Sequence, residues 1–321
     1  MKKLLYSIDE VSQFISQGKK MVLGADENIL NQLPQGDWIA GTTPYFVDCN
    51  GGQENHQLIA VYDFTDIAED AKFISYDINS IEQIYNDGFD NGFIILILPC
   101  YSDILGKYAV NAPSFEGFAT KPLVGWVAGH AYDASLPRTK TYFKSGASAS
   151  IDKGVAIHVK LPANKYAEVE MINPFTPGDG DKIEILKDGF LIDEVLVNGQ
   201  KCNFAQYLKD RSFAYPMVAD FGDVYMNTSV KLAEESVLVA GPVFKGQEYT
   251  FAKQIDIPKV LQEISVKAQD SPVFSCFCVA NYLYGQFEGK TFGNFDMVVT
   301  FGEIAYQLVN QTVVYLNVKD V

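Results

Sequence analysis

The residues best suited to chemistry lie in the last fifty positions of the chain. A Gly-Glu pair, Gly302-Glu303, stands between two apolar, strand-like runs over residues 295–300 and 313–318. A carboxylate between buried strands needs a partner, because an unpaired charge out of water is costly. Glu303 is therefore interpreted either as a structural carboxylate that accepts backbone N–H bonds or as a group that faces a ligand.

Two cysteines, Cys276 and Cys278, precede this segment with a single residue between them. Zinc hooks and thioredoxin-like redox sites need at least two intervening residues, so the spacing favours a buried structural pair. The alternative is a reactive thiol beside a helix that we expect to start near residue 278. The three histidines, His56, His130 and His158, are isolated in sequence. We therefore expect neither a metal site nor a cofactor.

Three short motifs in this region resemble the C-terminal domain of the FIST family. They are Ser275-Cys276, Gly302-Glu303-Ile304-Ala305 and Asn310-Gln311-Thr312. In place of the arginine that FIST domains carry after the cysteine, the chain has Val279-Ala280-Asn281. Thr42-Thr43 loosely resembles the Gly-Cys-Ser/Thr turn of the family's N-terminal half, without the cysteine. The resemblance is to a FIST-like bacterial branch of unknown function. It implies a sensor of small molecules such as amino acids, working with a signalling partner.

On this resemblance we expect a metabolite site in a pocket between two halves of the chain. Its predicted lining is Thr42, Thr43, Cys276, Gly302, Glu303, Asn310 and Gln311. One alternative is an enzyme with Cys276 as nucleophile, although a non-enzymatic role is the expectation. The other is a protein-interaction adaptor that uses some of the 18 Tyr, 22 Phe and 2 Trp side chains.

The elements that must position these residues indicate an α/β (α+β) protein with mixed sheets packed together and helices outside. Helix and strand alternate over residues 1–147, the FIST-N-like half, whereas residues 148–321, the FIST-C-like half, are rich in strands. Ser7 and Glu10 form a capping box, and the run 93–98 suits a strand covered on both faces. Further expectations are a helix over 77–85, a hairpin turn at 187–189 and an amphipathic helix over 257–268.

The small residues 145–150 are interpreted as a linker at the border of the halves, or as the tip of a hairpin. The formal net charge of −15 and the pI of about 4.6 create a field that repels nucleic acid and anionic membranes. The chain shows no apolar run long enough for a signal peptide or a membrane span. Five scattered cysteines fit free thiols in a reducing compartment, so the cytoplasm is the predicted location.

Overall fold

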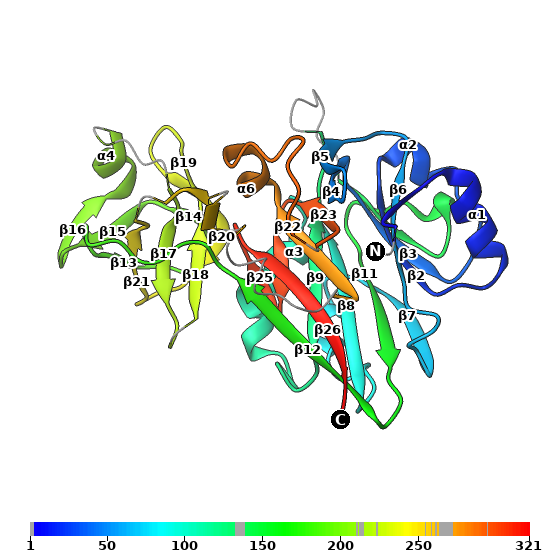
Figure 1. The fold of residues 1–321 in the computed structure, drawn as a ribbon. Coiled ribbons are helices and arrows are strands. Elements are labelled where there is room, and N and C mark those ends of the chain that lie inside the picture. The colour runs from blue at the N-terminus through cyan, green and yellow to red at the C-terminus, as the bar shows by residue number, and fades with distance from the viewer. Residues whose placement is uncertain are drawn as a thin grey trace.

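The computed structural model confirms an α+β fold, with three sheets in a main body and two in an insert (Figure 1). The described residues are 3–131, 139–209, 211, 215–222, 224–253, 255–257, 259–260, 262, 272–293 and 295–321. Most of the helix predicted over 257–268 lies outside them. No helix among the described residues is long and apolar enough to cross a membrane.

Three sheets form the body of the molecule. In spatial order, the N-terminal sheet contains β1 (Leu5–Tyr6), β6 (Ile59–Asp63), β2 (Met21–Ala25), β3 (Trp38–Thr42) and β10 (Thr141–Phe143). The central sheet contains β25 (Gln307–Val309), β24 (Glu303–Ala305), β9 (Leu123–Ala128), β8 (Gly92–Pro99), β11 (Gly154–Lys160) and β7 (Asp70–Tyr76). The C-terminal sheet contains β12 (Lys165–Ile172), β26 (Val313–Asp320), β22 (Phe274–Cys278), β23 (Met297–Thr300), β4 (Tyr45–Asp48) and β5 (Gly51–Glu54).

The other two sheets form a unit that we call the β-insert, residues 183–251. Its larger sheet contains β16 (Gln200–Asn203), β15 (Glu194–Val197), β13 (Ile183–Ile185), β21 (Glu248–Phe251), β17 (Met217–Asp220) and β18 (Tyr225–Thr228). Its smaller sheet contains β14 (Gly189–Ile192), β20 (Val237–Val243) and β19 (Val230–Leu232). The chain leaves the body after β12 and returns at β22, and both strands pair with β26. The β-insert is therefore an excursion from the C-terminal sheet, seen on the left of Figure 1.

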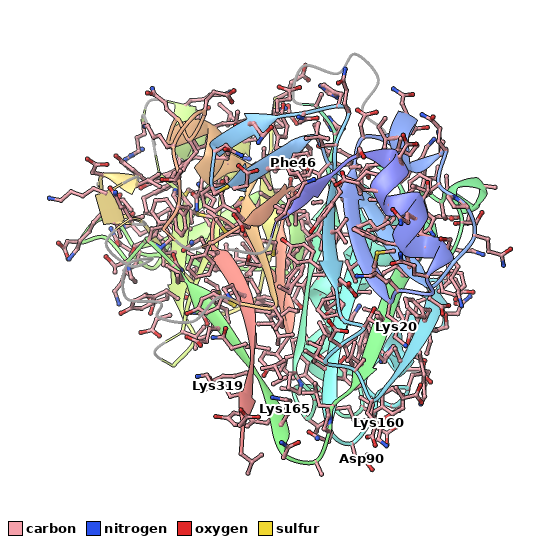
Figure 2. The ribbon with its side chains drawn as sticks, turned by 45° about the vertical axis from the view of Figure 1, so that its right-hand side comes forward. Lys20, Phe46, Asp90, Lys160, Lys165 and Lys319 are labelled. Atoms are coloured by element: carbon pink, nitrogen blue, oxygen red, sulfur yellow. The ribbon has the colours of Figure 1, made fainter. Side chains whose placement is uncertain are left out.

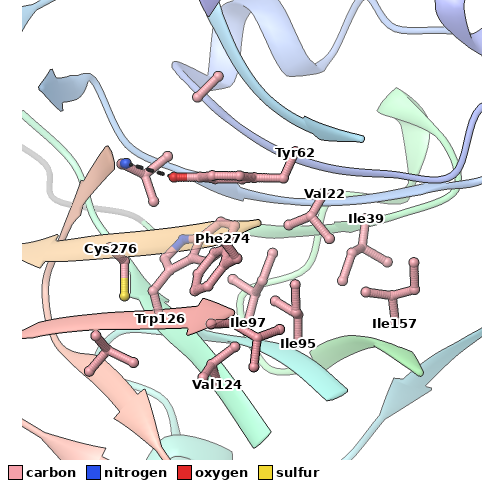
Figure 3. Packing of buried hydrophobic residues seen from close by; sticks show 14 of the residues in the cluster. Val22, Ile39, Tyr62, Ile95, Ile97, Val124, Trp126, Ile157, Phe274 and Cys276 are labelled. Carbon is pink, nitrogen blue, oxygen red and sulfur yellow. Dashed lines mark hydrogen bonds between the residues drawn. The ribbon is translucent and has the colours of Figure 1, made fainter. Parts of the chain in front are cut away.

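One apolar core joins the three sheets of the body (Figure 3). Ile39 and Tyr62 come from the N-terminal sheet, Trp126 from the central sheet and Phe274 from the C-terminal sheet. The rings of Trp126 and Phe274 stack with centroids 5.7 Å apart, and the Tyr62 hydroxyl accepts the Val298 N–H at 3.1 Å. Burial of large aromatic side chains is a main source of stability, so these contacts fix how the three sheets sit together.

Short helices cover the outer faces, and their boundaries follow the sequence signals. The capping box is confirmed: the Ser7 hydroxyl accepts the Glu10 N–H, and the Glu10 carboxylate accepts the Ser7 N–H. It opens α1 (Ile8–Ser16), which with α2 (Glu27–Leu30) covers the N-terminal sheet. α3 (Asp103–Asn111) covers the second face of the central sheet, so β8 is buried along its whole length, as predicted. Further helices among the described residues include α4 (Phe204–Lys209), α6 (Val279–Tyr284) and the 3₁₀ turns η1 (Ile81–Gln83), η2 (Ala112–Ser114) and η3 (Gly146–Ser148).

The helix predicted over residues 77–85 is wrong. Only the 3₁₀ turn η1 forms there, between turns. The Asp77 carboxylate accepts the backbone N–H groups of Asn79 and Ser80 at 2.8 and 2.9 Å. These are N-cap bonds to N–H groups that the first turn of any helix leaves free. The N–H groups of Gln83 and Ile84 then donate to carbonyls three residues earlier, so the chain winds a 3₁₀ turn instead of an α-helix.

The hairpin predicted around residues 187–189 is also wrong in its pairing. β13 pairs with β15 and β21, whereas β14 pairs with β20 in the other sheet of the β-insert. Gly189 does adopt a positive φ of 128°, which confirms it as the turn glycine. The chain uses the turn to change sheets instead of folding back, because Ile192 of β14 and Val237 of β20 share a buried core with Ile185 of β13 in the other sheet.

The C-terminal segment holds two more strands than predicted. The strand, helix and strand over β22, α6 and β23 are confirmed, as is the last strand, β26. Glu303 does not lie in a simple turn between β23 and β26, because it begins β24 of an intervening hairpin, β24–β25. β24 pairs with β9, which supplies the apolar neighbours that made the hairpin fold.

The segment 145–150 is a compact connection between β10 and β11 that contains η3. The Gly146 N–H donates to the Leu33 carbonyl at 3.1 Å, so the segment packs on the N-terminal sheet region. The central and C-terminal sheets each combine strands from both sides of residue 147. The division into halves at 147 and 148 stays a prediction.

Lysines gather where β11 and β12 meet at one end of the body (Figure 2). Lys160 pairs with Glu69, Lys165 with Asp320 and Lys319 with Glu168. Exposed pairs of this kind contribute little to stability. Because each lysine has an acidic neighbour, this end of the body is a solvated surface and not an anion site.

Candidate functional site

Five of the seven predicted site residues lie around the base of the hairpin β24–β25. Gly302 and Glu303 enter it, and Asn310 and Gln311 leave it. Cys276 lies on the adjacent β22 and is close enough for Glu303 to influence its pKa. All five are buried. The hairpin therefore brings these five residues together, and their role in binding a ligand stays a prediction.

Hydroxyl, amide and thiol donors surround the carboxyl group of Glu303. Thr312 donates to Oε2 from its backbone N–H at 3.1 Å and from its hydroxyl at 2.9 Å. The Thr300 hydroxyl lies 3.2 Å from Oε1, and the Cys278 thiol is also hydrogen-bonded to the Glu303 carboxyl group. Burial raises the pKa of Glu303 to about 8, against the lowering effect of these donors. The carboxyl group is therefore mostly neutral at pH 7, and its contacts support the structural interpretation.

The two buried cysteines lack the features of an activated nucleophile. The Cys276 thiol donates to the Gly125 carbonyl at 3.3 Å. Burial, reinforced by the nearby Glu303, raises the pKa of both Cys276 and Cys278 well above the usual thiol value. A catalytic thiol needs a lowered pKa and access to substrate. The geometry thus gives the cysteine-enzyme alternative no support.

Thr42 and Thr43 bind the end of β3 to its neighbours. The Thr43 hydroxyl donates to the Val299 carbonyl at 2.5 Å, and the Thr42 hydroxyl accepts the Lys140 N–H at 3.0 Å. The Thr42 carbonyl accepts the Gly129 N–H at 2.6 Å. Both hydroxyls are used in joining strands, so a contact of either threonine with a ligand stays a prediction.

Asn310 and Gln311 hold the β-insert against the body. Asn227 of β18 donates from Nδ2 to the Asn310 carbonyl at 3.2 Å, and the Ser229 hydroxyl donates to Gln311 Oε1 at 2.8 Å. Gln311 has a positive φ of 56°, at the turn where the chain leaves β25 and enters β26. The pair therefore docks the insert, a role that local sequence could not reveal.

A cleft of about 1150 Å³ lies between the body and the β-insert. Three sheet edges meet there: β12 of the C-terminal sheet, β25 of the central sheet and β18 of the insert. On the body side it is lined by Val110, Asn111, Pro113, Ser114, Phe118, Ala119, Val169, Met171, Ala305, Tyr306, Gln307 and Val309. On the side of the insert it is lined by Asp188, Phe221, Val224, Tyr225, Met226 and Phe244, and Asn173 lies on the connection that follows β12. None of the seven predicted site residues lines it.

The tip of the hairpin β24–β25 projects into this cleft. Tyr306 adopts a positive φ of 62°, and its carbonyl accepts the hydroxyls of Tyr85 at 2.9 Å and Tyr108 at 2.7 Å. A non-glycine residue in this backbone region is uncommon and needs such support. One hairpin therefore connects the buried Glu303 cluster to the wall of the cleft.

The three histidines lie apart from one another in the structure. His56 lies between Asp26 and Glu54 on the surface, and His130 packs against Phe301. His158 is buried, hydrogen-bonded to the Tyr76 hydroxyl at 2.9 Å, and burial lowers its pKa to about 3. No group of three or more His, Cys, Asp or Glu side chains suited to a metal occurs among the described residues.

The cysteines allow a direct check of the burial pattern. All five are free thiols in the structure, with Cys49 exposed and Cys276 and Cys278 buried. We expect a thiol reagent at pH 8 to modify Cys49 rapidly in the native protein and to reach Cys276 and Cys278 only after unfolding. Mass spectrometry of timed alkylation measures this order. Native modification of Cys276 as fast as Cys49 would contradict the buried cluster.

Comparison with known proteins yields a family but no activity. No curated protein matches the chain. A family described as being of unknown function matches residues 6–319, which include the body, the β-insert and both ends of the hairpin. Because the match extends over nearly the whole chain, the protein belongs to this family of unknown function, DUF6976.

Proposed function

We propose that the protein binds a small organic molecule in the cleft between the body and the β-insert. The observation that carries the proposal is the cleft itself, about 1150 Å³ with mostly apolar and aromatic lining. Ligand sites are typically concave, mainly apolar, and supplied with a few polar groups. The proposal keeps the sensory class implied by the FIST resemblance and moves the ligand from Glu303 to the other end of the same hairpin.

The connection of the cleft to the insert suits a sensor. The insert contacts the body through hydrogen bonds from Asn227 and Ser229, and it faces the body across the cleft. A ligand that touches both walls would stabilise the docked insert, which a signalling partner in the cytoplasm could detect. Binding of a ligand to the folded state alone adds about 2.7 kcal/mol of stability at 100 times its dissociation constant.

A dye assay with a blocking variant tests the site. Nile red, an uncharged dye that fluoresces in apolar surroundings, should bind the native protein. Val224 lines the cleft and is 49% exposed, so Val224→Trp adds bulk there without disturbing the core. We expect this variant to lose at least about tenfold in dye affinity, because the indole occupies the apolar volume.

Leu191→Trp is the matched control. Leu191 is also 49% exposed, lies on the β-insert and is not a lining residue of the cleft. It should bind the dye as the native protein does, with an unchanged melting temperature. Equal dye affinity in Val224→Trp and Leu191→Trp would exclude the cleft as the binding site.

A further inference from the structure

The cleft has one charged side chain among its described lining residues, Asp188. We propose that its ligands are aromatic molecules that carry an amine, with Asp188 as the counter-ion of the ammonium group. This inference rests on the proposed function and adds the chemical class of the ligand. It follows from three properties of the lining: its aromatic walls, the fixed position of Asp188 and the lack of a cationic group among the described lining residues.

The two walls present flat and polarisable groups to each other. Phe118 and Tyr306 belong to the body, whereas Phe221, Tyr225 and Phe244 belong to the β-insert. Two thioethers, Met171 and Met226, lie beside them, and aliphatic side chains fill the rest of the apolar lining. Aromatic rings and thioether sulfur make favourable contacts with a further ring, in edge or offset geometry. The walls therefore suit a planar ring system better than a flexible alkyl chain.

Asp188 is held in place at the turn between β13 and β14. Its Oδ1 accepts the backbone N–H of Lys245 at 2.6 Å. Within the described part of the chain no hydrogen bond engages Oδ2, so this oxygen can accept an ammonium N–H. The side chains of Lys187 and Lys245 are not among the groups that line the cleft. The carboxylate is thus oriented by the backbone and open to a ligand cation.

Gln307 supplies a second polar contact from the opposite wall. Its Nε2 donates to the sulfur of Met226 at 3.2 Å. A thioether is a weak acceptor, so a ligand oxygen or ring nitrogen that replaces it gains a better hydrogen bond. This amide can orient a ligand that carries an acceptor, but it does not select for charge.

An anionic ligand would find no counter-charge among the described residues of the cleft. The described residues that line the cleft include no Lys, Arg or His. The whole chain has a formal net charge of −15. A carboxylate ligand would approach Asp188 without a counter-charge, and like charges near each other are repelled. The cleft therefore discriminates against acids as well as favouring amines.

Three indoles of similar size test this selectivity: tryptamine, a cation; tryptophol, uncharged; and indole-3-acetate, an anion. Their dissociation constants can be measured by displacement of Nile red at pH 7 and low salt. We expect tryptamine to bind about threefold to fivefold more tightly than tryptophol, the range of an exposed ion pair, and indole-3-acetate more weakly than both. Added salt should reduce the preference for tryptamine.

Asp188→Asn should equalise tryptamine and tryptophol and leave the affinity for tryptophol unchanged. Asp193→Asn is the matched control, since it removes the same charge from the β-insert outside the cleft lining. It should keep the preference for tryptamine. The amine inference alone would be overturned if all three indoles bound equally well. It would also be overturned if Nile red bound but none of the three indoles displaced it. Failure of Nile red itself to bind would overturn the proposed function.

Discussion

Glu303→Gln is expected to destabilise the protein at pH 5 but not at pH 8. The folded state raises the pKa of Glu303 to about 8, chiefly through burial, from the ordinary value of 4.5. Between these pH values the unfolded chain releases a proton that the folded protein retains. The stabilising effect of the neutral carboxyl is therefore complete below about pH 4.5 and is lost as the pH rises toward 8.

One retained proton changes the free energy of unfolding by about 1.4 kcal/mol per pH unit, so the native protein should lose roughly 3 kcal/mol from this group between pH 5 and pH 8. The glutamine does not titrate and should remove this slope. At pH 5 the variant should be less stable, because the amide fits the Thr300 and Thr312 contacts less well. At pH 8 it should equal or exceed the native protein. Urea unfolding at both pH values measures this, and an unchanged slope in the variant would refute the buried neutral carboxyl.

The second large effect is expected for Gly125→Ala in β9. A Cβ atom at Gly125 would lie 1.8 Å from the carbonyl oxygen of Leu96 in the paired strand β8. This neighbour is backbone, so relief requires separation of two strands at the centre of the body. We expect a loss of more than about 4 kcal/mol, at the upper end of single substitutions, and little soluble folded protein.

Gly106→Ala is the matched control. Gly106 lies inside α3, and a Cβ atom there would meet nothing within 4 Å. Alanine in a helix interior is better than glycine by roughly 0.5–1 kcal/mol, so this variant should melt at a slightly higher temperature than the native protein. Soluble yield, far-ultraviolet circular dichroism and thermal melting compare the two. A melting temperature for Gly125→Ala within about 2 °C of the native value would show that β8 and β9 can separate cheaply.

Features that depend on neighbouring residues could be predicted from the sequence. The capping box of Ser7 and Glu10 and the doubly covered strand β8 are examples, since their signals lie within a few residues. The helix over 77–85 failed although Asp77 caps its start, because the N–H groups of the next turn donate to carbonyls three residues earlier and close only the 3₁₀ turn η1. The hairpin β24–β25 could not be predicted, because its partner β9 lies about 180 residues earlier in the chain.

The candidate site shows the same limit. The sequence singled out Glu303 as a buried carboxyl that needs partners, and its partners Thr300 and Thr312 are close in sequence. The cleft draws its walls from separate segments on the body and the insert, and apolar side chains such as Val169 and Phe244 resemble any others in sequence. A signal was nevertheless present in Tyr306, a polar aromatic residue at the tip of the hairpin that Glu303 begins.

The position of β26 has a consequence for synthesis of the chain on the ribosome. β26 stands between β12 and β22 and pairs with both. Its partners can lie far away in sequence, since Lys165 of β12 is opposite Asp320 of β26. The C-terminal sheet therefore cannot close until residues 313–320 have been made, while β12 has emerged long before. In the interval the edge of β12 can pair with a wrong partner, and such long-range pairing is slow. During this time the β-insert can fold on its own strands and keep the ends of β12 and β22 near each other until β26 arrives.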